Sequence, residues 1–269
     1  MRPGDLRGGG RGPMTMTLFD CNAAYGIFSV PPTRRADTPD DLLQEMASCG
    51  ISAALVRHAA QIDESPQVGN RVLCEQIRCH DDLAPSWAIL PPDTGELGDV
   101  ARFLADMRVE GVRALWAYPS KHRYLLNATT FGDLFDELVA RRIPLMLPRQ
   151  EQSGGHDAWQ VADELLSEFP DMRLAVVGHG PWGDDRYFRP MLRRYRHFYV
   201  DTSRYELDGG IAQVCQLYGP ERLLFGTAFP NTGMGGAMLT LLQCDMPDGH
   251  KRLVAGENLK RLLEEADLS

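Results

Sequence analysis

The chain has 269 residues, of which 43% are hydrophobic and 24% are charged, the mixture of an ordinary globular protein. Acidic residues outnumber basic ones by 37 to 28, which gives a formal net charge of −9. Such an acidic balance argues against nucleic acid or an anionic membrane as the main partner, and no apolar run approaches the roughly 20 residues that a membrane-spanning helix needs.

The N-terminal segment is rich in glycine and arginine and lacks the apolar core of a signal peptide. We expect residues 1–15 to form a disordered tail, with Met14 or Met16 as alternative starts of the chain. The cysteines form no CxxC pair, so we expect reduced, mostly buried thiols in a cytoplasmic protein. They are Cys21, Cys49, Cys74, Cys79, Cys215 and Cys244.

Short β-type runs alternate with longer helical patterns over residues 16–269. The runs end near Asp20, Arg57, Trp87, Leu115, Leu147, Gly178, Asp201 and Phe225. One strand-plus-helix unit takes about 30 residues, and these ends follow that spacing. Amphipathic stretches between them include 40–46, 131–140, 158–169 and 250–266. The pattern predicts one domain, a closed (β/α)8 barrel of the α/β class. A doubly wound open sheet is the alternative, but no GxGxxG follows the first run.

Candidate functional residues follow the ends of the predicted strands, where barrels of this kind place their active sites. The first run continues into Asn22, whose amide can hydrogen-bond a ligand. The second ends at Arg57, followed by His58. The fourth leads into Trp116, an aromatic that either walls a pocket or closes the barrel core.

Later strand ends carry a further group of candidates. Arg149 follows the fifth run and either clamps a carboxylate with a forked pair of hydrogen bonds or is a solvated loop charge. The sixth run ends in Gly-His-Gly around His179, which is a candidate general acid or base because an unperturbed imidazole titrates near neutral pH. At the seventh, Asp201 either orients a neighbour or caps a turn, and we prefer the cap. Arg204 follows at the mouth.

The eighth run, residues 222–230, reads Arg-Leu-Leu-Phe-Gly-Thr-Ala-Phe-Pro. Together with Gly-His-Gly at 178–180, Asp20 and the ending around Asn258, it resembles the amidohydrolase-related family of (β/α)8 barrels. The resemblance covers residues 17–266. It implies a single barrel, hydrolase or decarboxylase chemistry, and a structural role for Asn258.

The same resemblance implies a divalent metal such as zinc, held by four histidines and an aspartate. The family's first strand ends Asp-x-His-x-His, and Asn22 and Ala24 stand at the two histidine positions. Its eighth strand ends Gly-Ser/Thr-Asp-Phe/Tyr-Pro, and Ala228 stands for the aspartate. Pro148 follows the fifth strand, so only His179 matches a ligand. The sequence therefore predicts a degenerate metal site with no resident metal and no other cofactor.

Three interpretations stay open. The first is a metal-free hydrolase or lyase acting on a small carboxylated or carbonyl compound. The second is a noncatalytic barrel that binds a small molecule or serves as a subunit. The third is a metal-dependent hydrolase with relocated ligands such as His58, His122, His156 and Asp201. A homo-oligomer also stays open. The predicted catalytic residue is His179, and the predicted substrate-binding residues are Asn22, Arg57, Trp116, Arg149, Arg204, Thr227 and Phe229.

Overall fold

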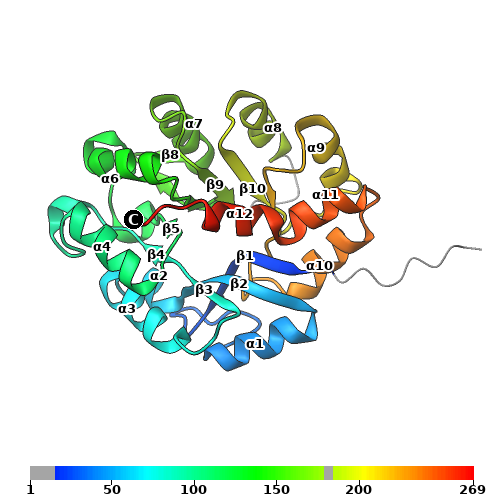
Figure 1. Cartoon of the computed structure of the whole chain (residues 1–269), viewed down its shortest axis with the longest axis horizontal. Coiled ribbons are helices and arrows are strands. Elements are labelled where there is room, and N and C mark those ends of the chain that lie inside the picture. The colour runs from blue at the N-terminus through cyan, green and yellow to red at the C-terminus, as the bar shows by residue number, and fades with distance from the viewer. Residues whose placement is uncertain (1–15, 179–183) are drawn as a thin grey trace, which may run out of the picture.

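The computed structural model describes residues 16–178 and 184–269. The predicted tail and the catalytic candidate His179 lie outside these residues. Parallel strands form the centre of the fold, and helices form a ring around them (Figure 1). The strands of the barrel are β1 (Leu18–Tyr25), β2 (Ile51–His58), β3 (Leu83–Pro85), β4 (Trp87–Ala88), β5 (Leu115–Trp116), β6 (Leu145–Pro148), β9 (Leu174–Val177), β10 (Phe198–Asp201) and β11 (Leu223–Leu224).

The remaining elements connect these strands or follow the last of them. The antiparallel hairpin of β7 (Gln152–Ser153) and β8 (His156–Asp157) lies in the connection after β6. The helices are α1 (Pro39–Ser48), α2 (Ala59–Asp63), α3 (Pro66–Ile77), η1 (Pro92–Thr94), α4 (Val100–Glu110), α5 (Pro119–His122), α6 (Ala128–Arg141), α7 (Ala158–Glu168), α8 (Asp185–Arg194), α9 (Gly210–Tyr218), α10 (Met234–Gln243), α11 (Asp248–Arg252), η2 (Leu253–Glu257) and α12 (Asn258–Glu264).

The strands close on themselves. The Cys21 N–H donates to the Phe225 carbonyl at 2.8 Å, and the Ala24 N–H donates to the Phe229 carbonyl at 2.9 Å, which joins β1 to the chain that follows β11. The two sheets also meet at the third barrel strand, where β3 pairs with β2 and β4 pairs with β5. The residue between them, Ser86, donates its hydroxyl to the Val56 carbonyl at 2.6 Å. The predicted (β/α)8 barrel is therefore confirmed.

Two strand boundaries differ from the sequence prediction. Strand β1 continues past Asp20 to Tyr25, because its backbone pairs with β2 on one side and with the chain after β11 on the other. The third barrel strand is broken at Ser86 into β3 and β4. A strand end read from local apolar runs misses both features, since they depend on partners distant in sequence.

The helix starts carry the capping residues that the sequence supplies. The Thr38 hydroxyl accepts the Asp41 N–H, and the Asp41 carboxylate accepts the Thr38 N–H. This is a capping box at the start of α1. Asp157 caps α7 in the same manner. The predicted helix 250–266 is divided by the π-helical turn η2, where a Cβ at Gly256 would lie 2.9 Å from the Cβ of Phe19.

The barrel has an interior core that is separate from the core beneath the helices. The interior cluster consists of small and large residues from successive strands, closed at one end by leucines of α12. Its buried members are Cys21, Leu55, Ala88, Ala114, Trp116, Tyr118, Met146, Ala175, Val177, Tyr199, Leu224, Leu259, Leu262 and Leu263. Arg113, just before β5, donates to the Ala266 carbonyl at 2.7 Å. Helix α12 therefore covers the end at which the strands begin, and crosses the barrel in Figure 1.

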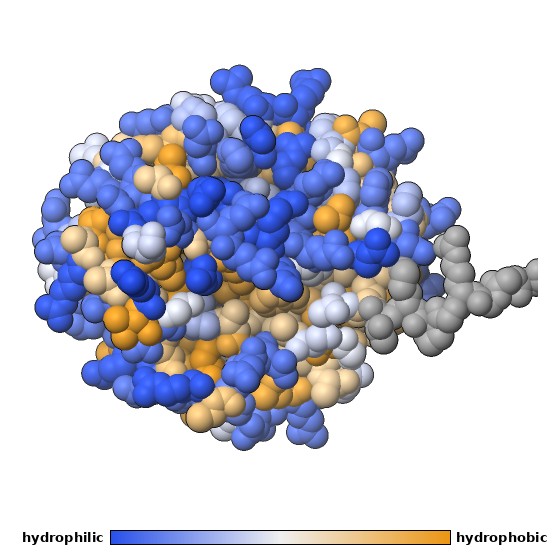
Figure 2. Space-filling model, in the orientation of Figure 1, coloured by the Kyte–Doolittle hydropathy of each residue, from blue (hydrophilic) through white to orange (hydrophobic). Residues whose placement is uncertain are grey.

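The face that carries α12 is mainly hydrophilic, with hydrophobic residues in scattered groups (Figure 2). Among residues 16–178 and 184–269, no helix is both long and apolar enough to cross a bilayer. The six cysteines are unpaired, and Cys21, Cys74 and Cys215 are buried. Asn258 has the structural role implied by the resemblance, because its amide donates to the carbonyls of Pro220 and Leu223 at 2.7 and 2.9 Å.

Candidate functional site at the carboxyl ends of the strands

Strand alternation places polar side chains at the top of the interior core. Side chains two residues apart on a strand share a face. Leu55 belongs to the interior cluster, so Arg57, two residues later on β2, also points inward. Tyr199 belongs to the same cluster, so Asp201, two residues later on β10, points inward as well. On β1 the pairing is irregular between Asp20 and Ala23, and there both Cys21 and Asn22 contact interior residues.

Arg57 lies at the centre of this polar layer and is only 8% exposed. Its guanidinium donates to Asn22 Oδ1 at 2.5 Å and to the Tyr118 hydroxyl at 3.3 Å. It also lies 4.1 Å from the centre of the Trp116 ring, a cation–π contact. All three partners are neutral. Within the described residues, no carboxylate forms an ion pair with this buried cation.

Asn22 connects Arg57 to Asp201. The Asn22 amide donates to Asp201 Oδ2 at 3.0 Å, and Ser203 donates its hydroxyl to the same oxygen. The other oxygen of Asp201 accepts the Gly178 N–H at 2.9 Å. Asp201 thus links three strands and orients Asn22, so our preference for a turn cap was wrong. The bonds run between residues too distant in sequence for a local pattern to reveal them.

A second buried carboxyl lies beside this network. Asp20 accepts the N–H groups of Asn22 and Thr227 at 2.9 and 3.0 Å, and the Thr227 hydroxyl at 2.5 Å. Burial raises the pKa of Asp20 to about 6. The hydrogen bonds from Thr227 and Asn22 lower this pKa, and the neighbouring charge of Asp201 raises it further. Thr227, a predicted substrate-binding residue, is therefore engaged in fixing β1 to the end of the barrel.

Ala228 and Phe229 form the turn that follows. Ala228 has a left-handed backbone with φ of 55°, and the Phe229–Pro230 peptide is cis. Phe229 is fully buried in the outer core, and its carbonyl accepts the Ala24 N–H. Gly226, just before, has no room for a side chain, since a Cβ would lie 2.5 Å from Asp201 Oδ2. This turn shapes the mouth through its backbone.

A cavity of about 400 Å³ opens above this layer. Its walls come from the connection after β1, from the ends of β2, β5 and β6, and from the turn after the eighth strand. Apolar walls are supplied by Phe28, Val30, Pro31, Pro32, Ile62 and Pro230, and charges by Arg57, Asp63, Lys121 and Glu151. The size suits a small organic molecule.

Glu151 is, with Asp63 and Lys121, one of three charged wall residues that the sequence prediction missed. It is 3% exposed, and its Oε2 accepts the N–H and the hydroxyl of Ser120 at 2.9 and 2.5 Å. Within the described residues, its Oε1 accepts no hydrogen bond and no basic side chain pairs with it. The only sequence signal was its place soon after the fifth strand, two residues beyond Arg149.

The other predicted residues lie around the cavity or beneath it. Trp116 is fully buried below Arg57, stacked on Tyr118 with ring centres 6.2 Å apart. Arg149 is exposed and pairs with Asp184 at 3.0 Å. Arg204 is also exposed, with φ of 60°. Neither arginine is among the residues that line the cavity, so of the three candidate arginines the structure brings only Arg57 to it.

The histidines proposed as relocated ligands are dispersed. His58 Nδ1 accepts the Ala60 N–H at 3.1 Å, and His122 Nε2 lies 2.9 Å from the Gln61 carbonyl. Burial lowers the pKa of both imidazoles. His156 pairs with Glu164 at the start of α7. Across residues 16–178 and 184–269, no three His, Cys, Asp or Glu side chains are grouped closely enough to hold a metal ion.

The donors at the described strand ends do not fit the divalent metal that the resemblance implies. Ala24 and Ala228 offer no ligand atoms, and Asn22 Oδ1 already accepts the Arg57 guanidinium. A second cation beside that guanidinium would be repelled in an interior where charges interact strongly. We therefore derive no chemistry through a metal.

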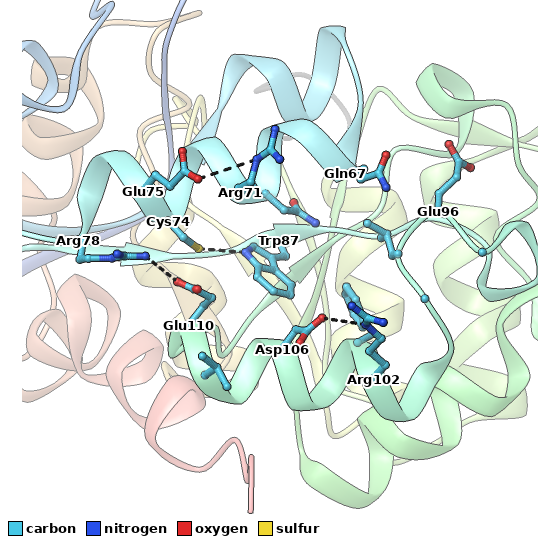
Figure 3. Close-up of a pocket in the computed structure, with 16 residues that line it drawn as sticks. Gln67, Arg71, Cys74, Glu75, Arg78, Trp87, Glu96, Arg102, Asp106 and Glu110 are labelled. Atoms are coloured by element: carbon cyan, nitrogen blue, oxygen red, sulfur yellow. Dashed lines mark hydrogen bonds and ion pairs between the residues drawn. The ribbon is translucent and has the colours of Figure 1, made fainter.

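A larger cavity of about 620 Å³ lies outside the barrel, between α3 and α4. Figure 3 shows its charged side chains pairing with one another: Arg78 at the end of α3 pairs with Glu110 of α4 at 3.8 Å, and Arg102 pairs with Asp106 within α4 at 3.8 Å. Trp87 donates to Cys74 at its floor. It lies between α3 and α4, outside the ring of strands, whereas the smaller cavity opens at their carboxyl ends, so the smaller cavity is the candidate active site.

The fold and this site define a (β/α)8 barrel with a polar layer and a cavity at the carboxyl ends of its strands. The chain belongs to the amidohydrolase family, whose model matches residues 16–264. Comparison with curated protein sequences gives no significant match.

Solved structures with the same fold share little sequence with this chain. A putative amidohydrolase from Staphylococcus aureus has a TM-score of 0.73 at 14% identity, covering 93% of this chain and 100% of that one. The 5-carboxyvanillate decarboxylase from Sphingomonas paucimobilis has a TM-score of 0.70 at 14% identity, with 93% and 99% covered. The 2,6-dihydroxybenzoate decarboxylase from Rhizobium has a TM-score of 0.69 at 15% identity, with 93% and 99% covered.

Proposed function

We propose that this amidohydrolase-family barrel binds a small carboxylated or carbonyl compound at its mouth and acts on it, as a hydrolase or lyase, without a metal. The observation that carries the proposal is Arg57. Arg57 is 8% exposed, forms an ion pair with no described carboxylate, and lies in the wall of a 400 Å³ cavity, so its guanidinium is suited to receive an anion.

The residues around Arg57 support the same role. Two of its N–H groups are used by Asn22 and Tyr118, which fix the plane of the guanidinium, and Trp116 supports it from below. Such a group is preorganised, so little conformational entropy is lost when a carboxylate or an oxyanion binds. The decarboxylases of carboxylated aromatics among the similar structures suggest the first compounds to test.

A noncatalytic binding barrel is the second candidate. Ala228 favours it, because a methyl group stands where the family resemblance places an aspartate that moves protons. Binding would then persist without turnover.

The test is a panel of substituted benzoates, esters and lactones, presented to protein that has been treated with a chelator. Binding is followed by thermal stabilisation and turnover by release of carbon dioxide or of the hydrolysed product. Binding with turnover supports the enzyme, and binding without turnover supports the second candidate. If no member stabilises the protein, the proposed function is wrong. Arg57→Met should weaken binding of the compounds that stabilise the protein. Arg149→Met is the matched control and should not, because it removes an exposed arginine outside the cavity.

A further inference from the structure

The cavity at the mouth carries two charged side chains that form no ion pair with any other side chain of the described residues. Asp63 and Lys121 pair with each other at 3.4 Å, and Asp63 also accepts the Ser29 N–H at 2.8 Å. Their charges are therefore balanced within the rim. Arg57 and Glu151 remain, one from the end of β2 and the other from the connection after β6, and neither forms an ion pair with any described residue.

Both of these charges are buried. Arg57 is 8% exposed and Glu151 is 3% exposed, and an unpaired charge removed from water is costly. Tyr118 lies near both charges. Its hydroxyl accepts a hydrogen bond from Arg57, and its pKa is raised by burial and by the charge of Glu151, although Arg57 lowers it. The arrangement is a fixed cation and a fixed anion in one small cavity.

The two carboxylate oxygens of Glu151 differ in their hydrogen bonds. Its Oε2 is used by Ser120 at the start of α5, while its Oε1 has no donor among the described residues. A merely structural role, capping α5, needs only the first oxygen. The second is available to a ligand in the cavity that Glu151 lines.

We propose that the cavity takes a small zwitterion, with its carboxylate on Arg57 and its protonated amine on Glu151 Oε1. This inference rests on the proposed function, because it assumes that a carboxylate binds at Arg57. It adds the class of compound: an amino acid or an amino-substituted carboxylate, in preference to a simple carboxylate. Electrostatic complementarity then selects the ligand by penalising any anion that leaves Glu151 without a partner.

The test compares the ortho, meta and para isomers of aminomethylbenzoate with the corresponding methylbenzoates by titration calorimetry. The three isomers place the carboxylate and the amine at different separations, so the set samples several ways in which a ligand could reach both Arg57 and Glu151. At least one amine isomer should bind wild-type protein tenfold or more tightly than its methyl counterpart. Glu151→Gln should abolish that preference while leaving methylbenzoate bound as well as before or better.

Glu151→Gln keeps an acceptor for Ser120, so the start of α5 should be preserved, which thermal unfolding checks. Glu151→Asp retains the charge and should keep part of the preference. Glu96→Gln, an exposed glutamate near the outer cavity, is the matched control and should change nothing. If methylbenzoates bind but no amine isomer gains, or if the gain persists in Glu151→Gln, this inference is wrong and the proposed function stands. If none of the six compounds binds, this inference is wrong, and the proposed function is decided separately by its own panel of benzoates, esters and lactones.

Discussion

Protonation of Asp20 should couple the stability of this barrel to pH. The carboxyl is fully buried between Asn22 and Thr227, and burial raises its pKa from 3.8 to about 6. Between these values the folded protein holds a proton that the unfolded chain has released. The free energy of unfolding contributed by this group therefore falls as pH rises from about 4 to about 6, and is constant above that.

The magnitude follows from the shift. One pKa unit corresponds to about 1.4 kcal/mol, so the whole effect is about 3 kcal/mol, of which about 2 kcal/mol develops between pH 4.5 and pH 7. Asp20→Asn removes the titration, while its carbonyl can still accept the N–H groups of Asn22 and Thr227. Relative to wild type, the variant should gain about 2 kcal/mol over this interval.

Urea denaturation of both proteins at half-unit steps from pH 4.5 to pH 8 measures the difference. Asp93→Asn, which changes an exposed aspartate on η1, should give a curve parallel to wild type. If the Asp20→Asn curve is also parallel to wild type, burial does not control the titration of Asp20 and the reasoning fails.

The remaining predictions concern the turn, the terminal helix and the effect of Arg57 on metal binding. Ala228→Gly should raise the free energy of unfolding by about 0.5–1 kcal/mol, because φ of 55° strains any side chain with a Cβ; an unchanged or lowered value in urea denaturation would contradict this. Asn258→Ala should lower it by about 2–3 kcal/mol, because two buried carbonyls lose their donors; a change below 1 kcal/mol would count against the bracing role. Asn22→His, Ala24→His and Ala228→Asp together should bind zinc at least tenfold more weakly with Arg57 present than with Arg57→Met added, because the guanidinium repels the ion. Equal affinities in calorimetry would show that Arg57 does not exclude a metal.

The fold was accessible from sequence because its signals are local. Apolar runs and their spacing lie within short stretches, and they gave the barrel and the positions of α1, α6 and α7. The end of β1 was placed too early, because its last residues are held by a strand from the other end of the chain.

The candidate site was only partly accessible. Arg57 and Asn22 were expected at the mouth, but the bond between Asn22 and Asp201 joins residues 179 positions apart, and no local pattern encodes it. Glu151 was missed because a carboxylate after a strand is usually a solvated loop charge. Its burial depends on Ser120 and on the walls of the cavity, which come from several different connections.

We propose that Arg57 alone, without a metal, holds the carboxylate of the ligand. The most direct measurement is the dissociation constant of a benzoate that stabilises the protein, determined by calorimetry in the presence of a chelator and again with zinc added. We expect the same dissociation constant in both solutions for wild type. Affinity should fall tenfold or more in Arg57→Met but not in Arg149→Met, since a charge-assisted hydrogen bond is worth about 1.5–3 kcal/mol. Binding that requires zinc, or that survives Arg57→Met unchanged, would contradict it.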